Sequence, residues 1–387
     1  MSAAKWRNAM KTGAQSSNVA RPNFSSSSPT TASSRAVQSA RDLHAAADSA
    51  SVFSRVRHSV RPRHLLVAIV ALAFPFFSTP FLTFQVMSQS LILGLVALSL
   101  SFLAGYGGMV SLAQMTVAGI AGYGVAVLGT SSAAEISLGW PWWVAVPMAV
   151  VVAVICATLI GWLSVRTEGI YTIMITLAIG MAFYYLVLQN YGVFNGFQGL
   201  RELKPPTVFS VNWRDPLPFY FMSLFCAMAG YFLVRYVVRA PFGIALQGIR
   251  DNPRRMEALG FHVVAHRVAA YALAGLIAAV GGILLAWYNA LMTPGSVGVS
   301  WLINMLVIAV LGGVKHPIGA FLGALVFVLL QTFAIDVIDR ERFNLVIGGV
   351  FLAIVLFSPD GLLGLWAKLR SRFGPNQAIT TTQRRLT

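Results

Sequence analysis

The sequence predicts an all-α integral membrane protein with about ten transmembrane helices and both termini in the cytoplasm. Apolar residues make up 57% of its 387 positions and charged residues only 10%, and the mean hydropathy of +0.72 is far above that of an ordinary soluble domain. The apolar residues gather in runs of about 20, the length that a helix needs to cross a bilayer core of about 30 Å. The basic residues concentrate in alternate connections between these runs, as they do in cytoplasmic loops.

Ten apolar runs can be distinguished along the chain. Each can cross the membrane as a helix, because a helical backbone satisfies its own hydrogen bonds inside lipid. The eighth and tenth runs are short, so we expect them to be broken, tilted or partly re-entrant. In chain order, the runs are Leu65–Leu82, Gln85–Ala104, Met109–Gly129, Trp142–Val165, Ile170–Leu188, Leu217–Val234, Val268–Leu291, Ser300–Val314, Pro317–Ile335 and Phe343–Phe357.

The distribution of Lys and Arg predicts the orientation. Both ends of the chain are basic and therefore belong inside, which requires an even number of spans. Threading ten spans places Arg166, the 235–267 connection and Lys315 inside, and the 189–216 and 336–342 connections outside. On this topology, 23 of the 28 Lys and Arg residues lie inside. The net charge of +16 is then mostly a signature of topology, so we do not interpret it as nucleic-acid binding.

The composition divides the chain into three parts. Residues 1–64 are rich in Ser, Ala and Thr and include "SSSSPTTASS", which predicts a disordered basic cytoplasmic extension; an organellar transit peptide has a similar composition and remains an alternative. Residues 65–365 form the predicted transmembrane domain, with a cytoplasmic loop at 239–266. Residues 366–387 are expected to be a basic cytoplasmic tail. Cys156 and Cys226 both fall in apolar runs, which favours packing roles over a disulfide.

None of the ten runs contains an Asp, Glu, Lys or Arg. Proton-coupled carriers usually keep an ionisable residue within the membrane, so the energy for any transport is expected to come from outside the spans. Sodium coupling through backbone carbonyls remains open. The polar residues of the spans are candidates for a translocation pathway, although each can instead form an interhelical hydrogen bond. The candidates are Ser111, Gln114, Thr172, Thr176 and Asn304.

One cytoplasmic stretch, "ALQGIRDNPRRMEALGF" (Ala245–Phe261), is unusually charged. Asp251 or Asn252 can cap a helix there, Pro253 suits its first turn, and Gly260 can end it. A helix of about two turns is not stable alone in water, so it needs a partner surface. The alternative is a solvated loop that its arginines anchor to lipid headgroups.

Four stretches resemble the LivM-type permeases, the inner-membrane subunits of bacterial ABC importers for branched-chain amino acids. The most specific is "ALQGIRDNPRRMEALGFHVVAHRVAAYALAGLIAAVGGILLA", which resembles their cytoplasmic coupling loop and following helix. "GYGGMVSLAQMTVAGIAGYG", "VLGGVKHPIGAFLGALVFVLLQ" and "LFSPDGLLGL" resemble an early glycine-rich span, a late glycine-rich segment and the family's ending. The resemblance covers about Val86 to Leu365.

The resemblance implies the fold and partners of an ABC importer permease. The partners would be two ATP-binding subunits, a second and non-identical permease, a periplasmic substrate-binding protein and membrane lipid. The coupling helix would contact an ATPase subunit, and glycine-broken helix ends would lie near the pathway. The implied contact residues are Arg250, Asp251, Asn252, Pro253, Arg254, Arg255, Glu257, Ala258 and Gly260, and the glycines are Gly105, Gly107, Gly108, Gly312 and Gly313.

Some positions depart from the family pattern. Ala113 stands where a glycine is usual, and Lys315, His316 and Pro317 replace small residues. The stretch "VFNGFQGL" (Val193–Leu200) only loosely matches the external loop of the family. Related permeases handle urea or short amides, so the sequence leaves the exact substrate open.

Other functional classes lack support in the sequence. No G-x-x-x-x-G-K-[ST] motif is present, so the chain is not expected to hydrolyse ATP itself. No span carries the clustered groups of an enzyme. His262 and His266 lie four residues apart without an apparent third ligand, and we predict neither a metal nor a cofactor. A self-contained carrier driven by an ion gradient remains the alternative function.

Overall fold

The computed structural model describes residues 74–75, 78–133, 135–167, 169–206, 212–337, 348–349, 352 and 361–364. The chain divides into two units, residues 1–68 and 69–387, and every described residue belongs to the second unit. The predictions for the extension (1–64) and the tail (366–387), and most of those for the first and tenth apolar runs, lie outside the described residues.

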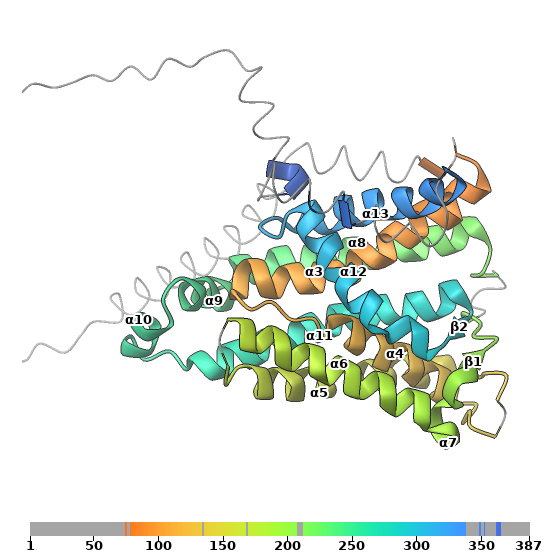
Figure 1. Cartoon of the computed structure of the whole chain (residues 1–387), viewed down its shortest axis with the longest axis horizontal. Coiled ribbons are helices and arrows are strands. Elements are labelled where there is room, and N and C mark those ends of the chain that lie inside the picture. Colours follow the sequence, from red (N-terminus) through yellow and green to blue (C-terminus); the bar gives the residue numbers. More distant parts are fainter. Residues whose placement is uncertain are drawn as a thin grey trace, which may run out of the picture. The chain divides into compact units, whose positions relative to one another are not determined.

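The described part of the chain is built almost entirely of helices (Figure 1). A two-residue strand, β1 (Leu200–Arg201), pairs antiparallel with β2 (Leu291–Met292), so that Leu200 lies opposite Met292. The helices in chain order are the π-helix η1 (Leu82–Ser88), α3 (Gln89–Gly107), α4 (Gln114–Leu128), α5 (Trp142–Ser164), α6 (Ile170–Gln189), α7 (Tyr191–Phe194), the 3₁₀ turn η2 (Gly196–Gln198), α8 (Pro216–Arg239), α9 (Pro241–Asp251), α10 (Pro253–Ala258), α11 (Val263–Asn289), the 3₁₀ turn η3 (Pro294–Val297), α12 (Val299–Gly312) and α13 (Pro317–Val337).

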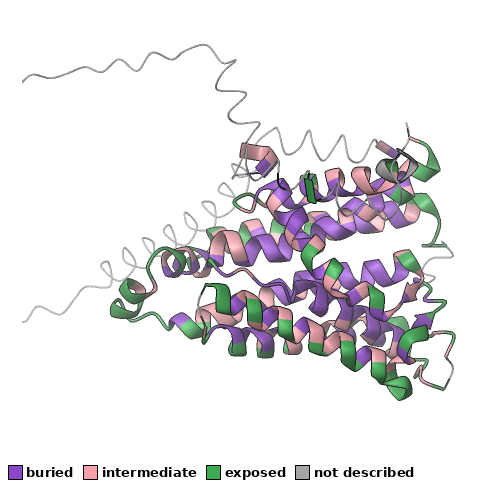
Figure 2. Ribbon diagram, viewed as in Figure 1, coloured by how far each residue is buried: buried purple, intermediate pink, exposed green. Residues whose placement is uncertain are grey.

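The helices α3 and α11 lie at the centre of the packing. Helix α11 contacts α3, α4 and α5, while α3 also contacts α8, α12 and α13, and both central helices carry long buried stretches (Figure 2). Small residues allow the close approaches. A Cβ added at Gly282 of α11 would overlap the backbone of Ala118 in α4. Such small-residue contacts are typical of helices that pack within a membrane.

Five helices are long and apolar enough to cross a membrane: Leu82–Gly107, α5, α6, α8 and α11. The helices α12 and α13 pass the same test only as a pair and are bent by 117° at their break, which makes them one broken span or a re-entrant loop. The described residues therefore contain five or six candidate spans. The eighth apolar run is not broken itself: it forms one continuous helix, α12, and the break lies between it and the ninth run.

The third apolar run does not form one continuous helix. Gly108 takes a left-handed conformation (φ 69°), where a residue without a Cβ is unstrained, and ends α3. The chain then runs without regular structure until α4 begins at Gln114. The prediction of a helix over Met109–Gly129 was therefore wrong for its first five residues, and α4 has only 15 residues.

Two helices extend into the segment that was predicted to be a cytoplasmic loop. Helix α8 continues to Arg239 and includes Arg235, and α11 begins at Val263 and includes Arg267. With α9 and α10 between them, most of the 235–267 connection is helical. The predicted edges were too short because they stopped at the first charged residue, whereas a helix can carry long basic side chains at its end.

The described connections gather at the two ends of the helices. At the end that carries β1, the backbone N–H of Ser132 donates to the carbonyl of Arg201 (2.9 Å), and Leu200 pairs with Met292. At the end that carries α10, the hydroxyl of Tyr106 lies 3.5 Å from the carbonyl oxygen of Lys315. We call these the β1 end and the α10 end.

The helices α5 and α6 leave wide apolar faces uncovered. On α5, alanines at every fourth position face the core from Ala145 to Ala157, while Val151, Ile155 and Leu159 are more than half exposed. Apolar surface of this extent is unusual for a soluble protein and suits contact with lipid or another membrane subunit.

Candidate functional site

The charged stretch forms two consecutive helices, α9 and α10, which we call the α9–α10 element. Of the two predicted caps, Asp251 and Asn252, it is Asn252 that caps α10: its side-chain oxygen accepts a hydrogen bond from the backbone N–H of Arg255 at 3.0 Å. Pro253 occupies the first turn, and Gly260 has the left-handed conformation (φ 88°) that lets the chain leave the helix. The local sequence therefore specifies both ends of α10.

Helix α9 anchors the element, and α10 projects from it. Leu246 and Ile249 of α9 are fully buried. No residue of α10 is buried, and Leu259, just beyond it, is 67% exposed. Met256 packs back against Gly248 of α9, where an added Cβ would lie 2.9 Å from its sulfur. The apolar side chains of the element are therefore divided: Ile249 and Met256 serve the chain's own packing, and Leu259 is exposed.

Arg250 is exposed at the edge of the element, and its side chain also reaches the end of α3. Its guanidinium donates to the carbonyl oxygen of Gly105 in the last turn of α3 and forms an ion pair with Asp251 at 2.9 Å. The other predicted contact residues, Arg254, Arg255, Glu257 and Ala258, remain exposed on α10.

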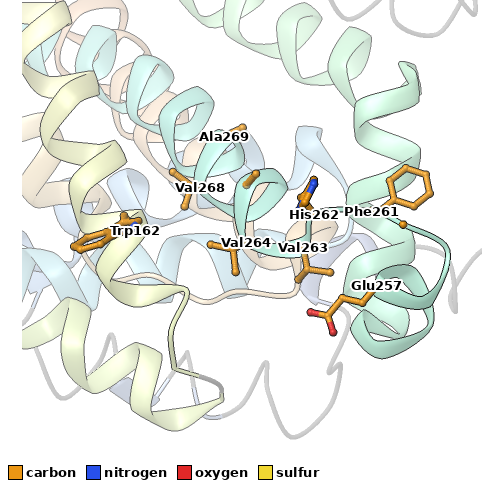
Figure 3. Close-up of a pocket in the computed structure, with 10 residues that line it drawn as sticks. Trp162, Glu257, Phe261, His262, Val263, Val264, Val268 and Ala269 are labelled. Carbon is orange, nitrogen blue, oxygen red and sulfur yellow. The ribbon is translucent and has the colours of Figure 1, made fainter.

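A hollow of about 820 Å³ adjoins the element. Figure 3 shows Trp162 of α5 on one side of it, Glu257 of α10 on the other, and Val264 and Val268 of α11 between them. The guanidinium of Arg166 lies 4.2 Å from the centre of the Trp162 ring, as in a cation–π contact. Trp162 could not be singled out from the sequence, because an aromatic residue at the end of an apolar run is ordinary at a membrane interface.

The two histidines have packing roles in the structure. The ring of His266 stacks on Phe242 of α9 (5.7 Å between centroids) and meets the edge of Phe261. Its Nδ1 lies 2.9 Å from the carbonyl oxygen of His262. Among the residues that the structure describes, no three His, Cys, Asp or Glu side chains form a group that could hold a metal ion.

Four of the five predicted pathway residues gather around the irregular segment between α3 and α4. The backbone N–H of Leu112 in this segment donates to the hydroxyl of Thr176 at 3.1 Å, and the hydroxyl of Ser99 donates to the side chain of Gln114 at 3.1 Å. The buried members of the group are Ser111, Gln114, Thr172 and Thr176. The fifth candidate, Asn304, is half-buried on α12.

Two hydroxyl groups that the sequence did not single out join this cluster. The hydroxyl of Tyr271 in α11 faces those of Ser111 and Ser164, and all three residues are almost fully buried. None of the three makes a well-formed hydrogen bond within the described part of the chain. Tyr271 sits in an apolar run, so only the folded structure brings it to Ser111.

The predicted glycine-broken helix ends occur at two places. Gly105 and Gly107 lie inside the last turn of α3, and Gly108 ends that helix. Gly312 ends α12, and Gly313 follows with φ 101°. An added Cβ at Gly312 would overlap the backbone of Gly319 in α13. The α12–α13 break therefore depends on direct backbone contact between glycines.

Comparison with known proteins identifies one family across most of the chain. The family described as "Branched-chain amino acid transport system / permease component" matches residues 82–355. No solved structure matches significantly.

The relatives include permeases for different solutes. The high-affinity branched-chain amino acid transport system permease protein LivM of Escherichia coli K12 is 23% identical over 79% of this chain and 76% of its own length. The probable branched-chain amino acid permease LivM of Methanocaldococcus jannaschii is 22% identical over 55% of this chain and 68% of its own. The ribose import permease RbsC of Haemophilus influenzae is 20% identical over 78% of this chain and 91% of its own.

Proposed function

The chain belongs to the family of branched-chain amino acid transport system permease components, and we propose that it is the LivM-type permease subunit of an ABC importer. It translocates branched-chain amino acids, or a related small amino acid or amide, and ATP hydrolysis on separate subunits supplies the energy. The match to the family over residues 82–355, together with five or six candidate spans, supports this function.

The subunit is a multi-pass protein of the bacterial inner membrane, with ten spans and both termini in the cytoplasm. The grouping of connections supports this orientation: the basic 235–267 segment and Lys315 lie at the α10 end, and the loops predicted to be external meet at the β1 end. The α10 end is then cytoplasmic, because basic residues concentrate on that side.

The α9–α10 element is the coupling element that docks in a groove of an ATPase subunit. The observation that carries this assignment is the exposure of α10, a helix of six residues that is capped at both ends yet buries none of them. A helix this short gains most of its stability from packing, so an exposed one is built to meet a partner. Arg254, Arg255, Glu257 and Leu259 provide the contacting surface.

The translocation pathway passes the start of α4. This helix begins next to the irregular segment at Gln114, and its first N–H groups present the partial positive charge of a helix N-terminus. Such an end can accept the carboxylate of an amino acid without an ionised side chain. Ser111 belongs to the irregular segment, Thr176 bonds to Leu112 of that segment, and Thr172 lies one turn before Thr176 in α6. Asn304 belongs to the same pathway.

The complete importer contains two ATPase subunits, a second related permease and a periplasmic binding protein. The exposed apolar faces of α5 and α6 support contact with lipid or with a neighbouring permease. The binding protein approaches from the β1 end, the external side in this orientation.

Co-purification followed by transport tests this function. The tagged chain is purified in mild detergent from cells that express the neighbouring transport genes, and its partners are identified by mass spectrometry. We expect a P-loop ATPase and a second permease, and ATP-dependent leucine uptake when the complex and a binding protein are reconstituted. A double substitution, Glu257→Ala with Gly260→Val, should abolish this uptake while the chain still inserts into the membrane. A chain that stays alone and transports leucine under an ion gradient would instead identify a secondary carrier.

A further inference from the structure

Besides the buried apolar residues of α9, one charged side chain connects the α9–α10 element to the end of α3. Arg250 lies in the last turn of α9, and its Nη1 donates to the carbonyl oxygen of Gly105, 145 residues earlier in the chain. The Nε of the same guanidinium donates to Asp251 at 2.9 Å. An arginine can form both interactions at once because its donors are arranged in a planar fork.

The end of α3 is shaped to receive this side chain. The last carbonyl groups of a helix lack partners within the helix, and the carbonyl of Gly105 is among them. A cation is also favoured there because the C-terminus of a helix carries partial negative charge. Gly108 provides the space: a Cβ added at this position would lie 2.6 Å from the Cγ of Arg250.

The same turn of α3 also contacts the α12–α13 break. A Cβ added at Gly105 would overlap the carbonyl oxygen of Val314, and the hydroxyl of Tyr106 lies 3.5 Å from the carbonyl oxygen of Lys315. The last turn of α3 is therefore held between Arg250 on one side and the turn of the bent α12–α13 pair on the other.

We propose that Arg250 is a positioning residue that transmits the movement of the α9–α10 element to α3 and, through it, to the α12–α13 break. This inference rests on the proposed function, because it takes α10 as the site where the ATPase docks. It gives Arg250 a role separate from that of its neighbours: Arg254, Arg255 and Glu257 contact the ATPase, and Arg250 connects the docked element to the spans. Removing the guanidinium of Arg250 should leave the ATPase docked but should uncouple ATP hydrolysis from transport.

The test measures docking and transport separately on the purified complex. For Arg250→Gln we expect the ATPase to co-purify at the wild-type ratio, and the amount of leucine transported per ATP hydrolysed to fall about tenfold. Arg250→Lys should recover part of this ratio, since an ammonium can still donate to the Gly105 carbonyl. The contrasting variant, Arg254→Gln with Arg255→Gln, should lose the ATPase.

A substitution at Gly108, which lies against the side chain of Arg250, provides a second test. Gly108→Ala leaves Arg250 unchanged but fills the space that its side chain occupies, so it should lower the transport ratio in the same way. Hydrogen exchange adds a readout that does not depend on transport. In the wild-type complex, a non-hydrolysable ATP analogue should change amide exchange both at 253–258 and at 103–109, and in Arg250→Gln only at 253–258.

Two results would overturn the inference. If Arg250→Gln loses the ATPase, Arg250 is a docking contact. If its transport ratio and its exchange response at 103–109 both match the wild type, the contact with Gly105 transmits nothing. If no ATPase co-purifies with the wild-type chain, the proposed function itself is refuted. This result is distinct from the two results above, which concern only the role of Arg250.

Discussion

Gly282 of α11 lies directly against the backbone of Ala118 of α4, and a Cβ added at Gly282 would overlap the Ala118 carbonyl group. The absence of a side chain on Gly282 therefore allows the central helix to approach α4 at this point. Both helices are buried there, so neither can move aside without disturbing the core.

Gly282→Ala should destabilise the protein despite the higher helix propensity of alanine. Overpacking a tight contact costs about 1–3 kcal/mol, which exceeds the gain of about 1 kcal/mol from replacing a helical glycine. Thermal unfolding in detergent measures the change. Gly295→Ala is the matched control, because its added Cβ would lie 3.6 Å from the nearest atom, an ordinary contact. Equal melting temperatures for the two variants would contradict the close packing of α4 and α11.

Asn252→Ala should weaken binding of the ATPase subunit. Loss of an N-cap costs about 1 kcal/mol, and in a helix as short as α10 we expect this to lower ATPase affinity about fivefold. Affinity is measured by titrating the purified ATPase onto the immobilised permease. Asn190→Ala removes the equivalent cap of α7, where Asn190 accepts from the backbone N–H of Val193 at 3.0 Å. Asn190→Ala should bind the ATPase with wild-type affinity. If both variants lose affinity, the effect is not specific to the cap of α10.

Thr176→Val should reduce both stability and leucine uptake. The substitution keeps the shape of the side chain but removes the acceptor for the backbone N–H of Leu112. A buried donor left without a partner costs about 1–3 kcal/mol, and it lies in the segment where we place the pathway. The control is Thr158→Val, since Thr158 bonds only within α5, to the carbonyl of Val154 at 2.7 Å. Wild-type uptake by Thr176→Val would argue against a pathway along this segment.

Thiol labelling should place the β1 end outside and the α10 end inside. The two native cysteines, which are both free, are first replaced by serine at Cys156 and alanine at Cys226. Phe197→Cys and Leu259→Cys then report on the two ends, because these positions are 76% and 67% exposed. A membrane-impermeant maleimide applied to intact cells should label the first and not the second. The reverse pattern would invert the topology.

Local features of the site could be predicted from the sequence. The Asn252 cap, Pro253 in the first turn and the left-handed Gly260 all follow from short-range preferences that act within one turn of helix. The edges of α5 and α6 also agree with the apolar runs to within one residue. The start of the third run was wrong because the chain stays irregular from Gly108 to Ala113, although these residues are apolar enough to continue a helix, and hydropathy does not reveal where a helix begins.

The sequence by itself determined that this chain is a helical membrane protein, because hydropathy and charge distribution record the cost of each residue in lipid. The transport permease family followed from the resemblance of four of its stretches. Only the tertiary structure decided that Arg250 turns toward Gly105 rather than toward a partner, and that Tyr271 faces Ser111 and Ser164. These relationships join residues more than 50 positions apart. They depend on how closely the helices pack, which is set by contacts between backbones and small residues and leaves no periodic signal in the sequence.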